Sequence, residues 1–239
     1  MGDNKTNLGD LTTDNGLRTT DNIHRVLVTS GPTRAYIDRI RYITNTSSGA
    51  LGARIVEALI SRGFPVTHIY GAGSEQPDVQ NSSLIESLEV ITVDDLSIAV
   101  KEVCARGDIS AVVHAMAVLD YAPESSLETK KKSGGDFWDI RLVRTPKIIS
   151  VLREIVPGAF TVGFKLEAGI SDKELICRAD VLLKKYGLDA VVANDLDRVN
   201  EIRHDAVIIG PGKKIIARCE TKEEIAGIVT EMIATGSDK

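Results

Sequence analysis

The 239-residue sequence has few aromatic residues and no surplus of basic ones. Phe, Trp and Tyr make up 4% of the chain, with a single Trp, and 29 Lys and Arg stand against 34 Asp and Glu. The resulting net charge of -5 argues against a general nucleic-acid binder, which carries a basic surplus. No apolar run reaches the length of a membrane span, and the amino terminus has no apolar signal segment, so we expect no membrane association.

Cysteine is also scarce. Cys104, Cys177 and Cys219 are odd in number, scattered, and not at metal-ligand spacing, which favours a reducing, cytoplasmic location. None of the four histidines has a partner at metal-ligand spacing, and no Ser-His-Asp or Cys-His nucleophile pattern stands out. We therefore expect no protein-built metal site.

What the chain does contain is 43% hydrophobic residues, enough for a sizeable core. Residues 1–22 are polar and predict a flexible tail, followed by a single α/β domain over residues 23–239. In that domain strand and helix patterns alternate, which predicts a doubly wound, mostly parallel, Rossmann-like sheet. The predicted strands cover residues 26–29, 66–70, 88–93, 111–116, 160–164 and 190–193, and the predicted helices 48–62, 95–105, 147–154 and 171–186.

Two further segments depart from this alternation. Residues 122–145 are less regular and predict a flap with short strands, on which Gly134 and Gly135 provide a hinge. Apolar runs on both sides of Gly210-Pro211-Gly212 predict a late β-hairpin over residues 206–217. Thr221 to Glu224 has the pattern of a capping box that opens a last helix.

The connection between the first strand and the first helix is the most informative segment. It predicts a long structureless loop that carries three arginines, Asp38 and Asn45, at the carboxyl end of a buried strand, where α/β sheets bind ligands. A loop of this length inside a compact domain favours a function. The helix start at Thr46 to Gly49 predicts an anion site, because its free amides and dipole face the loop. The first turn lacks G-x-G-x-x-G, and Tyr70-Gly71 has no acidic residue for a ribose, which disfavours a nicotinamide enzyme.

Several motifs together resemble the signature of the phosphopantothenoylcysteine synthetase family, the phosphopantothenate–cysteine ligases of coenzyme A synthesis. The motifs stand in the family's order and cover nearly everything from about Arg25 to the end. They are GPTR at 31–34, ID at 37–38, RYITNTSSG at 41–49, AMAVLDY at 115–121, KKK at 130–132, TPKII at 145–149, VGF at 162–164 and AND at 193–195. The resemblance is greatest to the free-standing bacterial form, without the flavin-dependent decarboxylase to which the ligase is often fused.

The resemblance implies a two-step reaction and the residues for it. The carboxylate of 4'-phosphopantothenate attacks the α-phosphate of a nucleoside triphosphate, usually CTP, and the amine of cysteine then displaces CMP. Asn45, Arg41 and Lys130 match catalytic positions, and Ser47, Ser48 and Gly49, with Asn45 and Arg41, match the substrate-binding loop. The positions matching nucleotide contacts are Ala115, Met116, Ala117, Asp120, Lys130, Lys132, Pro146, Lys147, Ile148, Ile149, Phe164 and Lys185. The resemblance also implies Mg²⁺ with the triphosphate, no flavin, and a homodimer whose site is shared between protomers.

The chain departs from the family's pattern at three places. Met116 and Leu119 are bulkier than usual, Lys131 replaces an isoleucine in the lysine cluster, and Lys147 stands where many relatives carry an acidic residue. Two alternatives therefore stay open: an ATP-using version of the same ligase, and a non-catalytic module that binds nucleotide or phosphopantothenate. A short-chain reductase is a distant third, because Tyr121 is followed four residues later by Ser125 and not by lysine.

Overall fold

A computed structural model describes residues 25–80, 82–200 and 202–236, so the tail predicted over residues 1–22 lies outside the described residues. The strands are β1 (Arg25–Ser30), β2 (Arg34–Tyr36), β3 (Tyr42–Thr44), β4 (Val66–Gly71), β5 (Ile85–Val90), β6 (Ile109–His114), β7 (Tyr121–Pro123), β8 (Leu142–Arg144), β9 (Phe160–Glu167), β10 (Ala190–Val199), β11 (His204–Gly210) and β12 (Lys214–Cys219). The helices are α1 (Ala50–Ser61), α2 (Val93–Cys104), α3 (Ile148–Ile155), α4 (Asp172–Tyr186) and α5 (Lys222–Gly236), with short 3₁₀ turns η2 (Ser82–Leu84) and η3 (Pro211–Lys213). No helix among the described residues is both long enough and apolar enough to span a bilayer.

One eight-stranded sheet organises the molecule, in the order β12-β11-β10-β9-β6-β1-β4-β5. The six strands from β10 to β5 are parallel, and β11 and β12 add antiparallel at the other edge. The chain builds outward from β1 to β4 and β5, then returns to β6 on the opposite side of β1 and continues to β9 and β10. The strand order therefore reverses between β1 and β6, and in doubly wound sheets ligands bind outside the carboxyl ends of the strands at that point.

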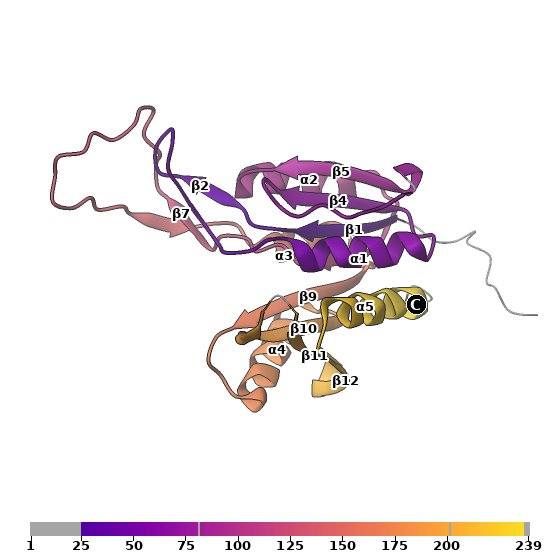
Figure 1. The fold of residues 1–239 in the computed structure, drawn as a ribbon. Helices are drawn as coiled ribbons and strands as arrows, with labels where there is room; N and C mark the ends of the chain where they lie inside the picture. Colours follow the sequence, from indigo (N-terminus) through magenta and orange to yellow (C-terminus); the bar gives the residue numbers. More distant parts are fainter. Residues whose placement is uncertain (1–24, 81, 201, 237–239) are drawn as a thin grey trace, which may run out of the picture.

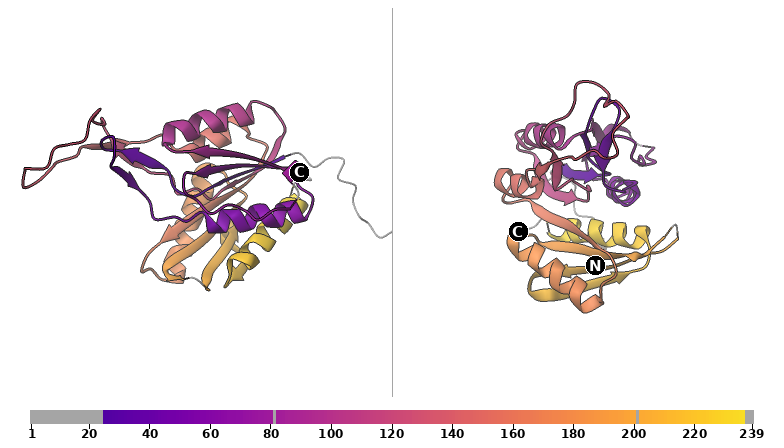
Figure 2. Two further views of the ribbon diagram at one scale, coloured as in Figure 1. Left: turned by 45° about the horizontal axis from the view of Figure 1, so that its top comes forward. Right: turned by 90° about the vertical axis from the view of Figure 1, so that its left-hand side faces the viewer.

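Helices cover both faces of the sheet (Figures 1 and 2). On one face α1 and α5 lie against each other and bury a core with Val28, Leu59 and Ile225 at its centre. On the other face α2 and α3 cover a second core, and α4 a third, beneath β9, β10 and β11. Strands buried on both faces supply residues to the cores on either side, which is typical of parallel sheets.

Two small sheets form an arm that projects beyond the carboxyl ends of the central strands (Figure 1). The β2–β3 hairpin follows β1, and the β7–β8 pair brackets the segment 124–141. The prediction of a structureless loop between β1 and α1 is thus partly wrong, because Arg34, Ala35 and Tyr36 pair antiparallel with Thr44, Ile43 and Tyr42. The flap with short strands predicted over 122–145 is confirmed.

The doubly wound sheet and the late hairpin are confirmed, whereas several boundaries are corrected. The strand predicted at 88–93 is β5 at 85–90, because Thr92 caps α2 through a complete capping box with Asp95. The strand predicted to reach Met116 ends at His114, and the helix predicted from residue 147 begins at Ile148, because Lys147 is an extended N-cap. The strands β9 and β10 both run beyond the predicted ends.

Candidate functional site

A cavity of about 840 Å³ opens at the switch point of the sheet. Its walls come from the segment between β3 and α1 with the first turn of α1, the loops after β4 and β6, the strands β9 and β10, and the beginnings of β11 and α5, so residues far apart in the sequence meet there. The lining residues are Asn45, Thr46, Ser47, Ser48, Gly49, Ala50, Leu51, Gly52, Glu75, Ala115, Met116, Ala117, Val118, Phe164, Leu166, Asn194, Leu196, Val199, Asn200, His204 and Lys222.

The first turn of α1 forms one wall of this cavity. Gly49 is its N-cap with φ +78° and has no side chain to cap the helix, while the amide of Ala50 donates to Ser48 Oγ at 3.3 Å. A Cβ on Gly49 would lie 2.8 Å from Cβ of Ser74, and one on Gly52 would lie 2.2 Å from Cβ of Ser30, so only glycine allows this close approach. The first amides of a helix lack intrahelical acceptors and carry the positive end of its dipole. The anion site predicted at the start of this helix therefore has the required geometry.

Asn45 joins this wall to the loop after β6. Its side-chain Nδ2 donates to the carbonyl oxygen of Ala117 at 3.1 Å and to that of Val118 at 3.4 Å. The main chain of the same loop is tied to β1, since Ala117 N donates to Gly31 O at 2.8 Å. To donate to a substrate oxyanion, Asn45 has to exchange one of its two carbonyl partners for the substrate.

The opposite wall is built by β10, β11 and α5. His204 is 9% exposed, and its Nε2 lies 3.4 Å from Nδ2 of Asn194. Burial of the ring lowers the pKa of His204, the positive charge of Lys222 lowers it further, and Asp205 opposes both. The imidazole is therefore neutral at pH 7, and Lys222 is the only full positive charge among the described residues that line the cavity.

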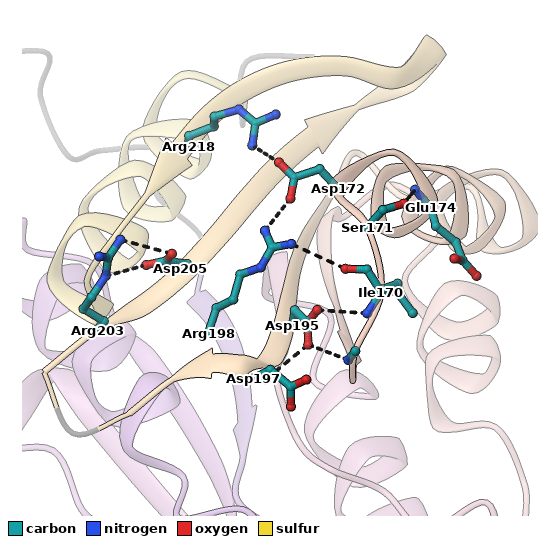
Figure 3. A network of polar contacts seen from close by, with 11 residues as sticks. Ile170, Ser171, Asp172, Glu174, Asp195, Asp197, Arg198, Arg203, Asp205 and Arg218 are labelled. Atoms are coloured by element: carbon teal, nitrogen blue, oxygen red, sulfur yellow. Dashed lines mark hydrogen bonds and ion pairs between the residues drawn. The ribbon is translucent and has the colours of Figure 1, made fainter.

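A network of polar contacts on the other side of β10 holds this wall in place (Figure 3). The buried carboxylate of Asp195 accepts from the amides of Gly169 and Ile170 at 3.0 and 3.1 Å. Arg198 and Arg218 both bind Asp172 at the start of α4, and these two arginines lower the pKa of that carboxyl. Neighbouring residues on a strand point to opposite faces, so the contacts of Asp195 fix Asn194 on the cavity side.

The structure brings eight of the predicted site residues to the cavity: Asn45, Ser47, Ser48, Gly49, Ala115, Met116, Ala117 and Phe164. The remaining ones do not line it. Ile148 and Ile149 are buried in the cores, Pro146 precedes α3, and Lys185 lies on α4 with its Nζ 5.1 Å from the ring centroid of Tyr186. Lys130 and Lys132 are exposed on the projecting flap.

Asp120 and Lys147 form an ion pair outside the cavity. Both side chains are about half exposed, and the two loops that carry them are also joined by Thr145 N donating to Asp120 O at 3.0 Å. The unusual lysine at position 147 thus neutralises the aspartate that was predicted to contact the nucleotide.

Arg41 lies on the arm, where Asp38 determines its orientation. The side chain of Asp38 is 0% exposed and accepts from Nη1 of Arg41 at 2.9 Å, from the amides of Ile40 and Arg41, and from the amide of Lys131 on the flap at 3.1 Å. The guanidinium of Arg41 lies 5.5 Å from the ring centroid of Trp138, and the ammonium of Lys131 lies 5.7 Å from the same centroid. This flap anchor, made of Asp38, Arg41, Lys131 and Trp138, joins the flap to the β2–β3 hairpin.

Sequence motifs did not identify the wall made by Asn194, Asn200, His204 and Lys222. Asn194 belongs to a motif that carried the resemblance, but no role followed from it. Lys222 lies within a capping pattern that gave it no role of its own, and Thr221 Oγ1 does accept from Glu224 N at 3.2 Å. These residues can be recognised only in the folded chain, because they reach the cavity when β10 and α5 lie next to the start of α1.

Comparisons with known proteins identify the family of this chain. Residues 22–236 match the family model of the DNA/pantothenate metabolism flavoprotein C-terminal domain. The chain is 41% identical over 186 residues to the coenzyme A biosynthesis bifunctional protein CoaBC of Thermococcus kodakarensis, covering 78% of this chain and 45% of that protein. The chain thus spans about half the length of the curated relative.

Solved structures show the same fold. The DNA/pantothenate metabolism flavoprotein from Streptococcus pneumoniae superposes with a TM-score of 0.81 at 30% identity, covering 89% of this chain and 99% of that one. The C-terminal domain of a coenzyme A biosynthesis bifunctional protein CoaBC superposes with a TM-score of 0.70 at 25% identity, covering 90% and 97% of the two chains.

Proposed function

We propose that this chain, which belongs to the DNA/pantothenate metabolism flavoprotein C-terminal domain family, is a ligase that joins 4'-phosphopantothenate to L-cysteine. The observation that carries the proposal is the cavity at the switch point, where Asn45, the uncapped start of α1 and Phe164 meet. The proposal also draws on the relatives, which are named as proteins of coenzyme A biosynthesis.

The proposed reaction has two balanced steps. A carboxylate oxygen of 4'-phosphopantothenate forms a bond to the α-phosphorus of CTP while the bond to the β-phosphate breaks, releasing pyrophosphate. The nitrogen of cysteine then attacks the acyl carbon, CMP leaves with the oxygen that bridged carbon and phosphorus, and the amine loses a proton. Both steps concentrate negative charge, so preorganised hydrogen-bond donors and cations stabilise their transition states.

The cavity supplies such donors from its main chain and side chains. The amides at the start of α1 face the charge of a phosphoryl group, and Asn45 offers an amide donor that does not titrate. Main-chain groups of Ala115 to Ala117 and the ring of Phe164 form the side against which we expect a base to pack. Backbone recognition of this kind favours CTP in our proposal, with ATP as the alternative to be tested.

Magnesium enters the proposal as part of the nucleotide substrate. Mg²⁺ keeps several waters and binds through substrate phosphates and one or two carboxylates. Among the described residues no group of three or more His, Cys, Asp or Glu is arranged to hold a metal ion. Glu75, the one carboxylate on the cavity wall, is bound to Arg54 at 2.8 Å.

The arm leads us to propose a homodimer. It exposes apolar side chains from both of its small sheets and from the flap: Tyr36, Ile40, Tyr42, Tyr121, Leu127, Phe137 and Leu142. Exposed apolar side chains gathered on one projecting part of a protein are typical of a surface that binds another protein. A second copy of the chain offers the same apolar residues for an isologous contact. In such a dimer the flap lysines Lys130 and Lys132, which lie outside the cavity of their own chain, would serve the cavity of the partner.

The experiment that tests the proposal measures pyrophosphate release with 4'-phosphopantothenate, cysteine and Mg²⁺, comparing CTP with ATP. Release that requires phosphopantothenate and is faster with CTP is the expected result. Faster release with ATP would keep the ligase and overturn the choice of base. Nucleotide binding without any release would overturn the ligase in favour of a binding module.

A further inference from the structure

Lys222 is a cation without a counter-charge in the cavity. It is the first residue of α5, it is partly buried, and it forms no ion pair with any of the described residues. The other full charge on the wall, Glu75, pairs with Arg54, whose guanidinium also binds Glu57 and approaches Glu223. Lys222 is therefore the cation on the wall that no carboxylate of the described residues pairs with, and no sequence motif assigned it a role.

The packing of two helices places Lys222 beside the start of α1. Arg54 of α1 approaches Glu223 of α5 at 3.8 Å, and Arg62 binds Glu231 at 2.6 Å. Because both pairs advance by the same number of residues along the two helices, α1 and α5 run in the same direction, as Figure 2 also shows. Both helices therefore begin at the same end of the molecule and direct their positive dipole ends toward the cavity.

A neutral imidazole accompanies Lys222 in the same wall. His204 is nine-tenths buried, and its Nε2 lies 3.4 Å from Nδ2 of Asn194. Its Nδ1 has almost no accessible surface, so the ring does not donate into the cavity. The polar groups that this region offers to a ligand are therefore the ammonium of Lys222 and the amides at the start of α1, and a ligand that accepts hydrogen bonds and carries negative charge suits both.

We propose that Lys222 binds a phosphoryl group of a substrate, together with the main-chain amides at the start of α1. The identity of the substrate rests on the function proposed above. Two substrates of that reaction carry phosphoryl groups, the nucleoside triphosphate and 4'-phosphopantothenate, and the same donors suit either one.

The test is a calorimetric titration of the full chain with each of the two substrates separately, so that no turnover takes place. We compare the wild type with Lys222→Met and Lys222→Arg, and use Lys101→Met on the far face, at the exposed end of α2, as the matched control. Lys222→Met should weaken the binding of one substrate about tenfold or more, whereas Lys222→Arg retains most of the affinity and Lys101→Met all of it. Thermal unfolding of each variant identifies any that is misfolded, and Lys222→Gln then replaces Lys222→Met.

Each outcome decides the matter. Weakened binding of MgCTP assigns Lys222 to the nucleotide, and weakened binding of 4'-phosphopantothenate assigns it to that substrate. Unchanged affinity for both, or no binding of either by the wild type, overturns the inference. Because binding is measured without catalysis, a chain that uses Lys222 to bind but makes no amide would overturn only the proposed function. A chain that makes the amide with Lys222→Met at normal affinity would overturn only this inference.

Discussion

At the scale of the residue, Asn45 is where two loops of the cavity meet. Its Nδ2 bridges to the carbonyl oxygens of Ala117 and Val118, so it holds the start of α1 against the segment after β6. The same donor is the group that we propose for the oxyanion of the acyl intermediate. Both tasks depend on an amide and not on a carboxylate.

We expect Asn45→Asp to release pyrophosphate but to form amide at least about a hundredfold more slowly, because it replaces a donor by a negative charge beside an anionic intermediate. Pyrophosphate release and product formation, measured in parallel on the same preparation, separate the two steps. Amide formation at the normal rate would refute the role proposed for Asn45.

His68 is one of two histidines, with His114, whose pKa burial lowers to about 4, so its charge state affects stability. Its ring is fully buried in β4, its Nε2 lies 2.7 Å from Ser30 Oγ, and burial lowers its pKa to about 4 from an unfolded value of 6.5. Between these values the unfolded chain binds a proton that the folded chain does not. The folded state is therefore favoured above pH 6.5 and loses stability as the pH falls toward 4.

We expect urea unfolding to show this loss, on the order of 2 kcal/mol from His68 between pH 7 and pH 5. In His68→Gln the free energy of unfolding should fall less over the same interval, whatever the stability of the variant at pH 7. An identical fall in wild type and variant would show that His68 does not remain neutral in the folded chain.

Among single residues, the sequence predicted those on the wall formed by the start of α1, the loop after β6 and β9. Asn45, Gly49, Met116 and Phe164 lie in ordered motifs and were predicted by resemblance, and all four line the wall. Lys222 and His204 lie in segments whose local patterns predict a helix cap and a hairpin strand. Their place in the cavity depends on contacts between segments distant in the sequence, which no local pattern encodes.

At the scale of the element, the flap anchor connects the β2–β3 hairpin to the flap. The buried carboxylate of Asp38 accepts four hydrogen bonds, one of them from the flap at Lys131, and the backbone hydrogen bonds together with Arg41 lower its pKa although burial alone would raise it. Trp138, the only tryptophan of the chain, lies within 6 Å of two cations of the anchor, so its fluorescence reports on the anchor.

We expect Asp38→Asn to loosen the flap, because the neutral amide loses the ion pair to Arg41 and accepts the amide of Lys131 less strongly. Acrylamide should then quench the fluorescence of Trp138 more efficiently than in the wild type. Asp139→Asn, an exposed neighbour of Trp138 on the flap, is the matched control and should leave quenching unchanged. Equal quenching in wild type and Asp38→Asn would contradict the anchor.

The elements themselves follow from sequence to different degrees. Long amphipathic or buried segments such as α1, α4 and β1 were predicted within a few residues, since their apolar spacing is unambiguous. The β2–β3 hairpin was missed, because strands of three residues are too short to show an alternating apolar pattern and the hairpin lies outside the main sheet. The extension of β10 to Val199 is stabilised by Asp195, which binds the loop before α4, and by Arg198, which binds Asp172 at the start of α4, and both partners are remote in sequence.

At the scale of the whole molecule, the residues proposed for the reaction lie in two separate places. The cavity lies on the body of the domain, whereas Lys130 and Lys132 lie on the arm outside it. Alternation of strands and helices predicted the doubly wound body. The geometry of the arm requires tertiary structure, and the dimer that we propose requires a second chain.

Mixing two inactive variants tests whether sites are shared between copies. We expect Asn45→Asp and Lys130→Gln each to form almost no amide. After subunit exchange their equimolar mixture should form amide at about a quarter of the wild-type rate, since half of the dimers are mixed and one of the two sites in each mixed dimer is intact. Wild type treated in the same way controls for losses during exchange. A mixture that is no more active than its parents would show that each chain uses its own flap.

The measurement that tests the central claim most directly follows oxygen from the carboxylate of 4'-phosphopantothenate. With ¹⁸O in both carboxylate oxygens, attack on the α-phosphate followed by displacement by cysteine transfers one label to the nucleotide product. We predict by mass spectrometry that each CMP formed carries one ¹⁸O and that each amide retains the other. Label in inorganic phosphate, or amide formed with unlabelled CMP, would contradict an acyl-nucleotide ligase.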